Sequence, residues 1–257
     1  MTEIRTIRRE ESEDFLKLVC DTFDLDFNLA YDLFMSEPMF DLNRKWVLME
    51  GREMVAACTT TPLVFGWGKA VGIAGVATRK SRQNEGHATK LLAKVLRESE
   101  RREDGPALLL AKQTGLYDRL GFELLDRVIA APLAVDPAEP EEPMLNDAQV
   151  QAIYNNWAEQ DPNRLRRNDA RWEYWKWHCR TTQAAGQGYI CYEGNVLREA
   201  ILPEPMAMIP LPNSTEFFGL SNVADVLELP VFVPRTELVL MGRGVPGIPQ
   251  FFLTDQF

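Results

Sequence analysis

Residues 71–102 switch from one hydrophobic period to another. The first part, 71–78 (VGIAGVAT), is rich in β-branched and small residues and predicts a strand. A polar, basic segment follows at 79–85, and beyond it the apolar side chains recur at helical spacing. The apolar helix positions are Ala88, Leu91, Leu92, Val95 and Leu96. The sequence therefore predicts a strand, a tight turn and an amphipathic helix in that order.

The same patterns predict the elements on either side of this unit. Strands are expected at 4–7, 45–50, 54–61, 106–112 and 123–133, and helices at 10–23, 28–35 and briefly after Thr114. Gly66, Trp67 and Gly68 suggest an additional hairpin arm at 63–71. The predicted order is β, α, α, β, β, β, α, β, α, β, with 123–133 expected as the last strand of a first domain.

The second half of the chain has a different composition. Residues 136–143 (DPAEPEEP) are proline-rich and acidic, which is typical of a linker. We therefore expect a first domain at 1–134, a linker at 135–145 and a smaller α+β domain at 146–257. Its expected elements are a helix capped by Asn146, a helix capped by Asp169, a hairpin at 188–201, a helix at 221–229 and a strand at 231–241 interrupted by Pro234. The apolar tail, 242–257, is expected to dock on the protein.

The turn before the central helix has the features of an anion site. The first four N–H groups of a helix lack intrahelical partners, and the helix dipole adds partial positive charge there. Gly86 and Ala88 leave the backbone bare, so that a phosphate can approach the amides closely. Arg79, Lys80 and Arg82 are expected to add positive charge. The turn thus predicts a phosphate or pyrophosphate site.

Val76-Ala77-Thr78 followed by Gln83-x-x-Gly86-x-Ala88 resembles the acetyl-coenzyme A signature of the GCN5-related N-acetyltransferases (GNAT). The resemblance implies a mixed, splayed α/β sheet flanked by helices, acetyl-CoA as acyl donor, and the predicted order of elements. It also implies that the turn holds the pyrophosphate and the preceding strand the pantetheine arm. The implied cofactor-binding residues are Val76, Ala77, Thr78, Gln83, Asn84, Glu85, Gly86, His87, Ala88 and Thr89. A helix that simply begins at a glycine is the alternative for this segment.

A second motif follows the buried strand at 106–112. The run Tyr117-x-x-Leu-Gly121-Phe122 resembles the Tyr-x-x-Leu-Gly-Phe run of the same family, and Gly121 stands where a left-handed C-cap residue belongs. The resemblance implies that Tyr117 reaches the coenzyme A sulfur and acts as general acid. The alternative is a core tyrosine that caps a short helix.

The chain end resembles the enhanced-intracellular-survival branch of that family, although 257 residues are too few for all three domains of that branch. There the terminal carboxylate lies in the active site, which implies Phe257 as a candidate general base. The strand 71–76 carries no carboxylate where many relatives place a glutamate. A water chain, Glu37 and His178 remain the other candidates for the proton acceptor.

Composition disfavours several other classes of protein. The net charge of −10 and the pI of about 4.9 disfavour nucleic-acid binding, although the basic stretch 163–171 and its neighbouring tryptophans keep that reading as a minor alternative. Four scattered cysteines and two histidines predict neither a metal site nor a disulfide framework. With no apolar run of membrane length and a charged N-terminus, we expect a cytoplasmic protein without a membrane partner.

Together these features predict an acetyl-CoA-dependent N-acetyltransferase that acts on a primary amine of a small molecule or peptide. Homo-oligomerisation is left open. The alternative from another class is a non-catalytic acyl-CoA-binding sensor or scaffold of the same fold, which the missing strand carboxylate favours and Tyr117 disfavours.

Overall fold

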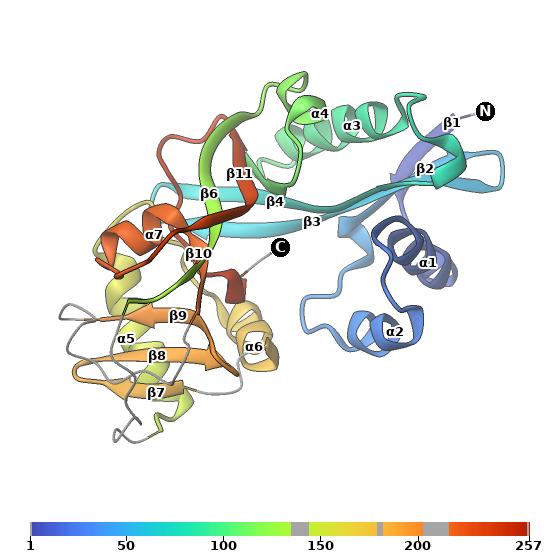
Figure 1. Ribbon diagram of the computed structural model, residues 1–257. Helices are drawn as coiled ribbons and strands as arrows, with labels where there is room; N and C mark the ends of the chain where they lie inside the picture. Colours follow the sequence, from blue (N-terminus) through green and yellow to red (C-terminus); the bar gives the residue numbers. More distant parts are fainter. Residues whose placement is uncertain (1, 135–143, 179–181, 203–215, 256) are drawn as a thin grey trace.

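Eleven strands form one sheet in the computed structural model, which describes residues 2–134, 144–178, 182–202, 216–255 and 257. The strand order is β1-β2-β3-β4-β5-β11-β6-β10-β9-β8-β7 (Figure 1). The N-terminal half supplies β1 Thr2–Thr6, β2 Lys45–Glu50, β3 Glu53–Phe65, β4 Gly68–Thr78, β5 Ala107–Ala111 and β6 Glu123–Pro132. The C-terminal half supplies β7 Thr182–Ala185, β8 Gly188–Glu193, β9 Val196–Ile201, β10 Glu216–Leu220 and β11 Arg235–Arg243.

The helices of the N-terminal half cover both faces of its strands. They are α1 Ser12–Phe23, α2 Phe27–Ser36, α3 His87–Arg101 and the short α4 Gly115–Asp118. Helix α3 packs its apolar stripe on β2 to β5, and α1 packs on the opposite face (Figure 1). The predicted order of elements from β1 to β6 is thereby confirmed. The hairpin expected at 63–71 is present, with Phe65 paired to Gly68, but it is the end of the long β3–β4 hairpin and not an additional arm.

Strand β11 of the C-terminal half enters the sheet between β5 and β6, the two strands expected to end the first domain. Strand β11 lies antiparallel between β5 and β6, so that Val239 faces Ala111 on one side and Arg127 on the other. An alternating apolar pattern predicts a strand but not its neighbours, which is why 235–243 was assigned to a separate unit. The division at 134 and 146 remains a prediction about folding units. In the structure the pairing of β11 crosses it.

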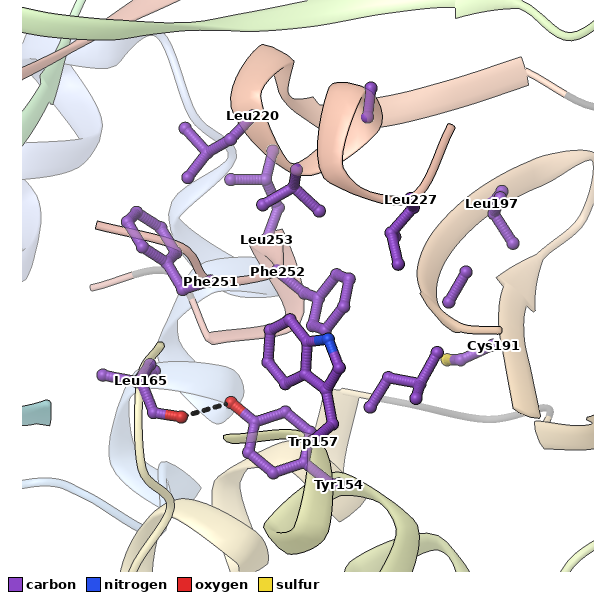
Figure 2. Packing of buried hydrophobic residues seen from close by; sticks show 14 of the residues in the cluster. Tyr154, Trp157, Leu165, Cys191, Leu197, Leu220, Leu227, Phe251, Phe252 and Leu253 are labelled. Carbon is purple, nitrogen blue, oxygen red and sulfur yellow. Dashed lines mark hydrogen bonds between the residues drawn. The ribbon is translucent and has the colours of Figure 1, made fainter. Parts of the chain in front are cut away.

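The rest of the C-terminal half packs against this sheet through a shared core. Its helices are α5 Asp147–Glu159, α6 Asp169–His178 and α7 Ser221–Val226, and the tail ends in a 3-10 turn, η5 Leu253–Asp255. Figure 2 shows Trp157 and Tyr154 of α5 beside Phe251 and Phe252 of the tail. Phe251 and Phe252 are at most 2% exposed. The expected docking of the tail is therefore confirmed, and its cause is burial of aromatic surface.

Several smaller expectations were also resolved. Asn146 caps α5 through the amide of Gln149, as predicted, whereas α6 is capped by Asn168 rather than Asp169, through the amide of Arg171. The predicted linker, 136–143, lies outside the described residues. Cys191 is disulfide-bonded, against the expectation from cysteine spacing, because spacing along a chain does not report distances after folding. In the described part of the chain, no helix is long and apolar enough to cross a membrane.

Candidate active site

Strands β4 and β5 separate at the centre of the sheet. They pair in parallel only from Val71 to Ile73 on β4 and from Ala107 to Leu109 on β5. Beyond that point the strands diverge and leave a cavity of about 650 Å³. The cavity is lined by Phe23, Ile73, Ala74, Gly75, Val76, Leu110, Ala111, Lys112, Gln113, Gly115, Leu116, Tyr117, Leu238 and Phe257. We call it the donor cavity.

A bulge on β4 exposes two backbone units at the mouth of this cavity. Ala57 on β3 pairs with Ala77, but Thr59 pairs with Ala74, so Gly75 and Val76 have no partner on β3. Gly75 has φ +58, a left-handed conformation that side chains rarely adopt. Bulges of this kind redirect backbone groups and are frequent next to active sites. Gly75 and Val76 both line the donor cavity, so the bulge brings their backbone to its wall.

The predicted anion turn has the backbone geometry that it needs. Asn84 and Gly86 both have positive φ, 66° and 78°, and α3 begins directly afterwards at His87. In the described part of the chain, the amides from Asn84 to Thr89 donate to no protein acceptor. They therefore form an open cluster of N–H groups at a helix N-terminus, which is the arrangement that binds phosphates.

The cationic side chains of the turn are engaged by carboxylates. Arg82 pairs with Glu50 at 2.8 Å and with Glu85 at 2.9 Å, and the guanidinium holds the pKa of Glu85 down at about 2. Lys80 pairs with Asp24 at 2.7 Å, and Arg79 pairs with Glu53 at 3.1 Å. All three cations that were expected to add positive charge to the phosphate site are thus paired with carboxylates. The N–H groups of the turn, in contrast, have no protein acceptor among the described residues.

The other predicted cofactor residues differ in whether their side chains reach the donor cavity. Val76 lines the donor cavity, whereas Ala77 is fully buried beneath α1. The side chain of Gln83 donates to the carbonyl of Thr78 at 3.3 Å and thereby ties the turn to the end of β4. His87 is 4% exposed and its ring is 2.9 Å from Glu85. The ring of His87 is thus engaged within the protein, and its backbone amide belongs to the open N–H cluster together with those of Ala88 and Thr89.

Tyr117 lies on α4, with its side chain on the wall of the donor cavity. Its ring packs edge-on against Phe122, with the centroids 6.1 Å apart. Burial raises the pKa of the Tyr117 phenol, so the proton stays on the oxygen at neutral pH. Gly121 has φ +79 and ends the turn after α4, as the sequence predicted. No described side chain or backbone group bonds the Tyr117 hydroxyl, which leaves it available to a ligand.

Phe257 lies at the junction of the donor cavity and a second one. The second cavity, of about 200 Å³, shares Ala74, Gly75 and Phe257 with the first. We call it the acceptor cavity. The ring of Phe257 packs on Gly72 of β4, where a Cβ would collide with it, and lies 5.6 Å from the ring of Phe251. The structure thus brings Val76, Tyr117 and Phe257 together.

The family model of an acetyltransferase (GNAT) domain matches residues 3–125. These residues form a GNAT domain. The order of the elements, the splayed strands and the mixed sheet flanked by helices all agree with that family. The match supports acyl-CoA-dependent acetyl transfer in general.

Solved structures resemble nearly the whole chain. A GCN5-related N-acetyltransferase from Kribbella flavida has 14% identity and a TM-score of 0.74, covering 94% of this chain and 70% of its own. A GCN5-related N-acetyltransferase from Anabaena variabilis has 16% identity and a TM-score of 0.69, and the match covers 95% of this chain and 72% of its own. Eis1 from Mycobacterium abscessus has 15% identity and a TM-score of 0.64, and the match covers 93% of this chain and 73% of its own. At these identities the likeness shows the fold alone. No curated protein matches the sequence.

The GNAT domain receives the tail of the chain through a buried ionic network. The guanidinium of Arg167 donates to both carboxylate oxygens of Asp255 and to both of Glu199, at distances from 2.6 to 3.1 Å. Arg171 donates to the Asp255 carbonyl at 2.9 Å and to the Pro62 carbonyl of β3 at 3.3 Å. The side chains of Arg167, Glu199 and Asp255 are fully buried. The network therefore fixes η5, two residues before Phe257, against β3.

This network also bears on the alternative that the protein binds nucleic acid. The basic stretch 163–171 was the sequence feature that carried it. Arg167 and Arg171 are 7% and 2% exposed, and Arg164 lies over the ring of Trp157 at 4.4 Å. Arg167 and Arg171 therefore take part in the packing around the tail, whereas Arg166 of the same stretch is exposed.

Some residues of the site were not predicted. Gly75 carries a usable signal, because an isolated glycine inside a strand pattern suggests a bulge. Leu238 of β11 lines the donor cavity, and Lys45 and Tyr174 line the acceptor cavity. No local pattern marks these three, because long-range pairing and packing bring them there. Among the proposed proton acceptors, Glu37 also lines the acceptor cavity, and the side chain of His178 lies outside the described part.

Proposed function

We propose that the protein is an acetyl-CoA-dependent N-acetyltransferase acting on a primary amine. The observation that carries the proposal is the convergence of Val76, Tyr117 and Phe257 on one cavity, where β4 and β5 part. The open amides between Asn84 and Thr89 would hold the pyrophosphate of the coenzyme. Its pantetheine arm would then follow β4 into the donor cavity.

The groups of the site suit each step of acyl transfer. A base takes a proton from the ammonium, and the neutral amine attacks the thioester carbon, forming the C–N bond. The backbone amides of the β4 bulge, at Gly75 and Val76, would stabilise the oxyanion. The C–S bond then breaks, and Tyr117 gives its proton to the thiolate and regains one from the new amide nitrogen. The products are the N-acetyl amine and free coenzyme A.

For the base we propose the carboxylate of Phe257. Its support is the position of Phe257 between the donor and acceptor cavities and the buried network that fixes the preceding turn. A variant with one glycine added after Phe257 should displace the carboxylate and lower kcat about 10²-fold or more, since general base catalysis contributes that much. Unchanged turnover in that variant would transfer the role to Glu37 or to water.

The decisive experiment is thiol release from acetyl-CoA with a panel of primary amines. Turnover above the amine-free rate supports the enzyme. Coenzyme A binding by calorimetry without thiol release for any amine would instead support the sensor or scaffold reading. Absence of coenzyme binding would overturn both.

A further inference from the structure

The acceptor cavity contains a buried ammonium group. Lys45 opens β2, lines this cavity, and has a side chain that is 4% exposed. Its Nζ lies 4.7 Å from the ring centroid of Phe34, 4.9 Å from that of Phe40 and 5.9 Å from that of Phe15. The three rings form an aromatic cage, which stabilises a cation. Because Lys45 already occupies it, the cage is closed to a cation from outside.

The hydrogen-bonding capacity of this ammonium is largely unused. An ammonium has three donors. The nearest carboxylate oxygen of Glu37 is 3.6 Å away, which is an ion pair but too long for a good hydrogen bond. Within the described residues, Glu37 is the one side chain that pairs with Lys45 Nζ. Burial is the main influence on the Lys45 pKa and lowers it, which means that the protein incompletely compensates the charge.

Strand pairing connects Lys45 to the part of β4 that carries the proposed reaction centre. Lys45 pairs with Thr59 on β3, and Thr59 pairs with Ala74 on β4. All three line the acceptor cavity, and Ala74 also lines the donor cavity. Neighbouring strands are about 4.8 Å apart, so two strand spacings separate the backbones of Lys45 and Ala74. One small molecule can therefore reach from the bulge at Gly75 to Lys45.

The other walls of the acceptor cavity indicate what kind of molecule fits there. They are mainly apolar, from Phe15, Leu16, Val19, Phe34 and Met39. Besides Lys45, the charged side chain of the cavity is Glu37, which is 26% exposed. Phe257, whose carboxylate is the proposed base, also lines the cavity, at its junction with the donor cavity. A second ammonium on the acceptor would meet Lys45 in this small space and be repelled. A carboxylate would instead supply the acceptor atoms that Lys45 lacks.

We propose that the acceptor is a small amine with an apolar body that also bears a carboxylate, and that Lys45 binds this carboxylate. The inference rests on the proposed acetyl transfer, because it assigns the acceptor cavity to the amine. Glu37 is the internal carboxylate that faces Lys45 when the acceptor is absent, and the acceptor's carboxylate takes over that contact. In this arrangement Lys45 is a binding residue and takes no part in the proton transfers.

The test compares acceptors that differ in one group. Leucine, leucinamide, 3-methylbutylamine and 1,4-diaminobutane share a primary amine, but leucine alone has a carboxylate. We expect kcat/KM for leucine to exceed that of 3-methylbutylamine about 10- to 100-fold, the range of one charge-assisted hydrogen bond. The difference should lie mainly in KM, since the carboxylate contact is made in substrate and transition state alike. Equal values for leucine and leucinamide would overturn the inference.

A pair of lysine variants separates a specific contact from general charge. Lys45→Met is similar in length and removes the ammonium, and we expect the leucine preference to fall toward one. Lys17→Met on α1 removes an exposed charge, 50% exposed and paired with Glu13, and should keep the preference. A preference that survives Lys45→Met would overturn the role of Lys45.

A binding measurement keeps the inference distinct from the catalytic proposal. Calorimetry of N-acetylleucine and of its amide, each added to the protein with coenzyme A, needs no turnover. Tighter binding of the acid than of the amide, lost in Lys45→Met, supports the carboxylate site even if no amine is acetylated. No difference between acid and amide would overturn the site, whether or not the protein proves to be an acetyltransferase.

Discussion

The ring of Phe257 lies directly on Gly72, at a place on β4 where a Cβ would collide with it. Gly72 is itself buried in the strand, between the pairing with β3 and the parallel pairing with β5. The contact therefore joins the end of the chain to the strand that leads to the bulge at Gly75.

This contact predicts that Gly72→Ala displaces Phe257 and lowers kcat by about 10-fold or more, with the coenzyme affinity retained, because the base would leave its position. A double-mutant cycle with Phe257→Ala provides the check. If the methyl acts by moving the ring, Gly72→Ala should add little further loss in the Phe257→Ala background. Additive losses would point to a separate effect on β4.

Tyr117→Phe is expected to reduce kcat about 10²-fold while the coenzyme still binds, because the phenol is the proposed proton donor. The pH profile gives a second check. An acid works only while protonated, and burial raises the pKa of Tyr117 above its ordinary value of about 10. The alkaline loss of kcat that depends on Tyr117 should thus lie above pH 10 and be missing in Tyr117→Phe. A wild-type rate in the variant would remove the role.

Gly86→Glu should abolish coenzyme A binding, measured by calorimetry. The new carboxylate stands at the helix N-terminus where a diphosphate would bind, and the left-handed φ of +78 adds backbone strain. Gly194→Glu is the matched control, with φ +59, open space around it and the same added charge in the β8–β9 turn. Undiminished affinity in Gly86→Glu, or equal loss in both variants, would refute the amide site.

Arg167→Met should lower the free energy of unfolding by about 3–5 kcal/mol, because it leaves the carboxylates of Glu199 and Asp255 buried without their main partner. Urea denaturation measures the effect. Arg198→Met is the control: its pair with Glu193 is partly exposed, and its loss should cost about 1 kcal/mol or less. Similar costs for the two variants would contradict the structural role of the buried network.

The parts of the site that the sequence predicted are those encoded locally. The change of period after Thr78, the glycine before α3 and the run from Tyr117 to Phe122 each depend on residues within a few positions of one another. Helix caps and left-handed turns are local interactions, so residue type and spacing report them directly. The strand, the anion turn and α4 were found in this way.

The parts that it missed depend on distant segments. The apolar strand pattern at 235–243 does not predict that β11 lies between β5 and β6. The same alternating pattern is compatible with any pair of neighbouring strands. A run of arginines at 163–171 looks like a basic surface until the partners of Arg167 are known. The cage around Lys45 likewise combines rings from α1, α2 and the segment before β2.

The sequence by itself therefore determined the GNAT strand-turn-helix unit and the candidates Gly86 and Tyr117, since their conformations follow from nearest neighbours along the chain. Only the tertiary structure decided that Phe257 reaches Gly72, that Arg167 fixes the tail, and that Lys45 lies buried beside the bulge at Gly75. These contacts follow from burial of apolar surface and compensation of buried charge. Both depend on which distant residues meet, and no local pattern contains that information.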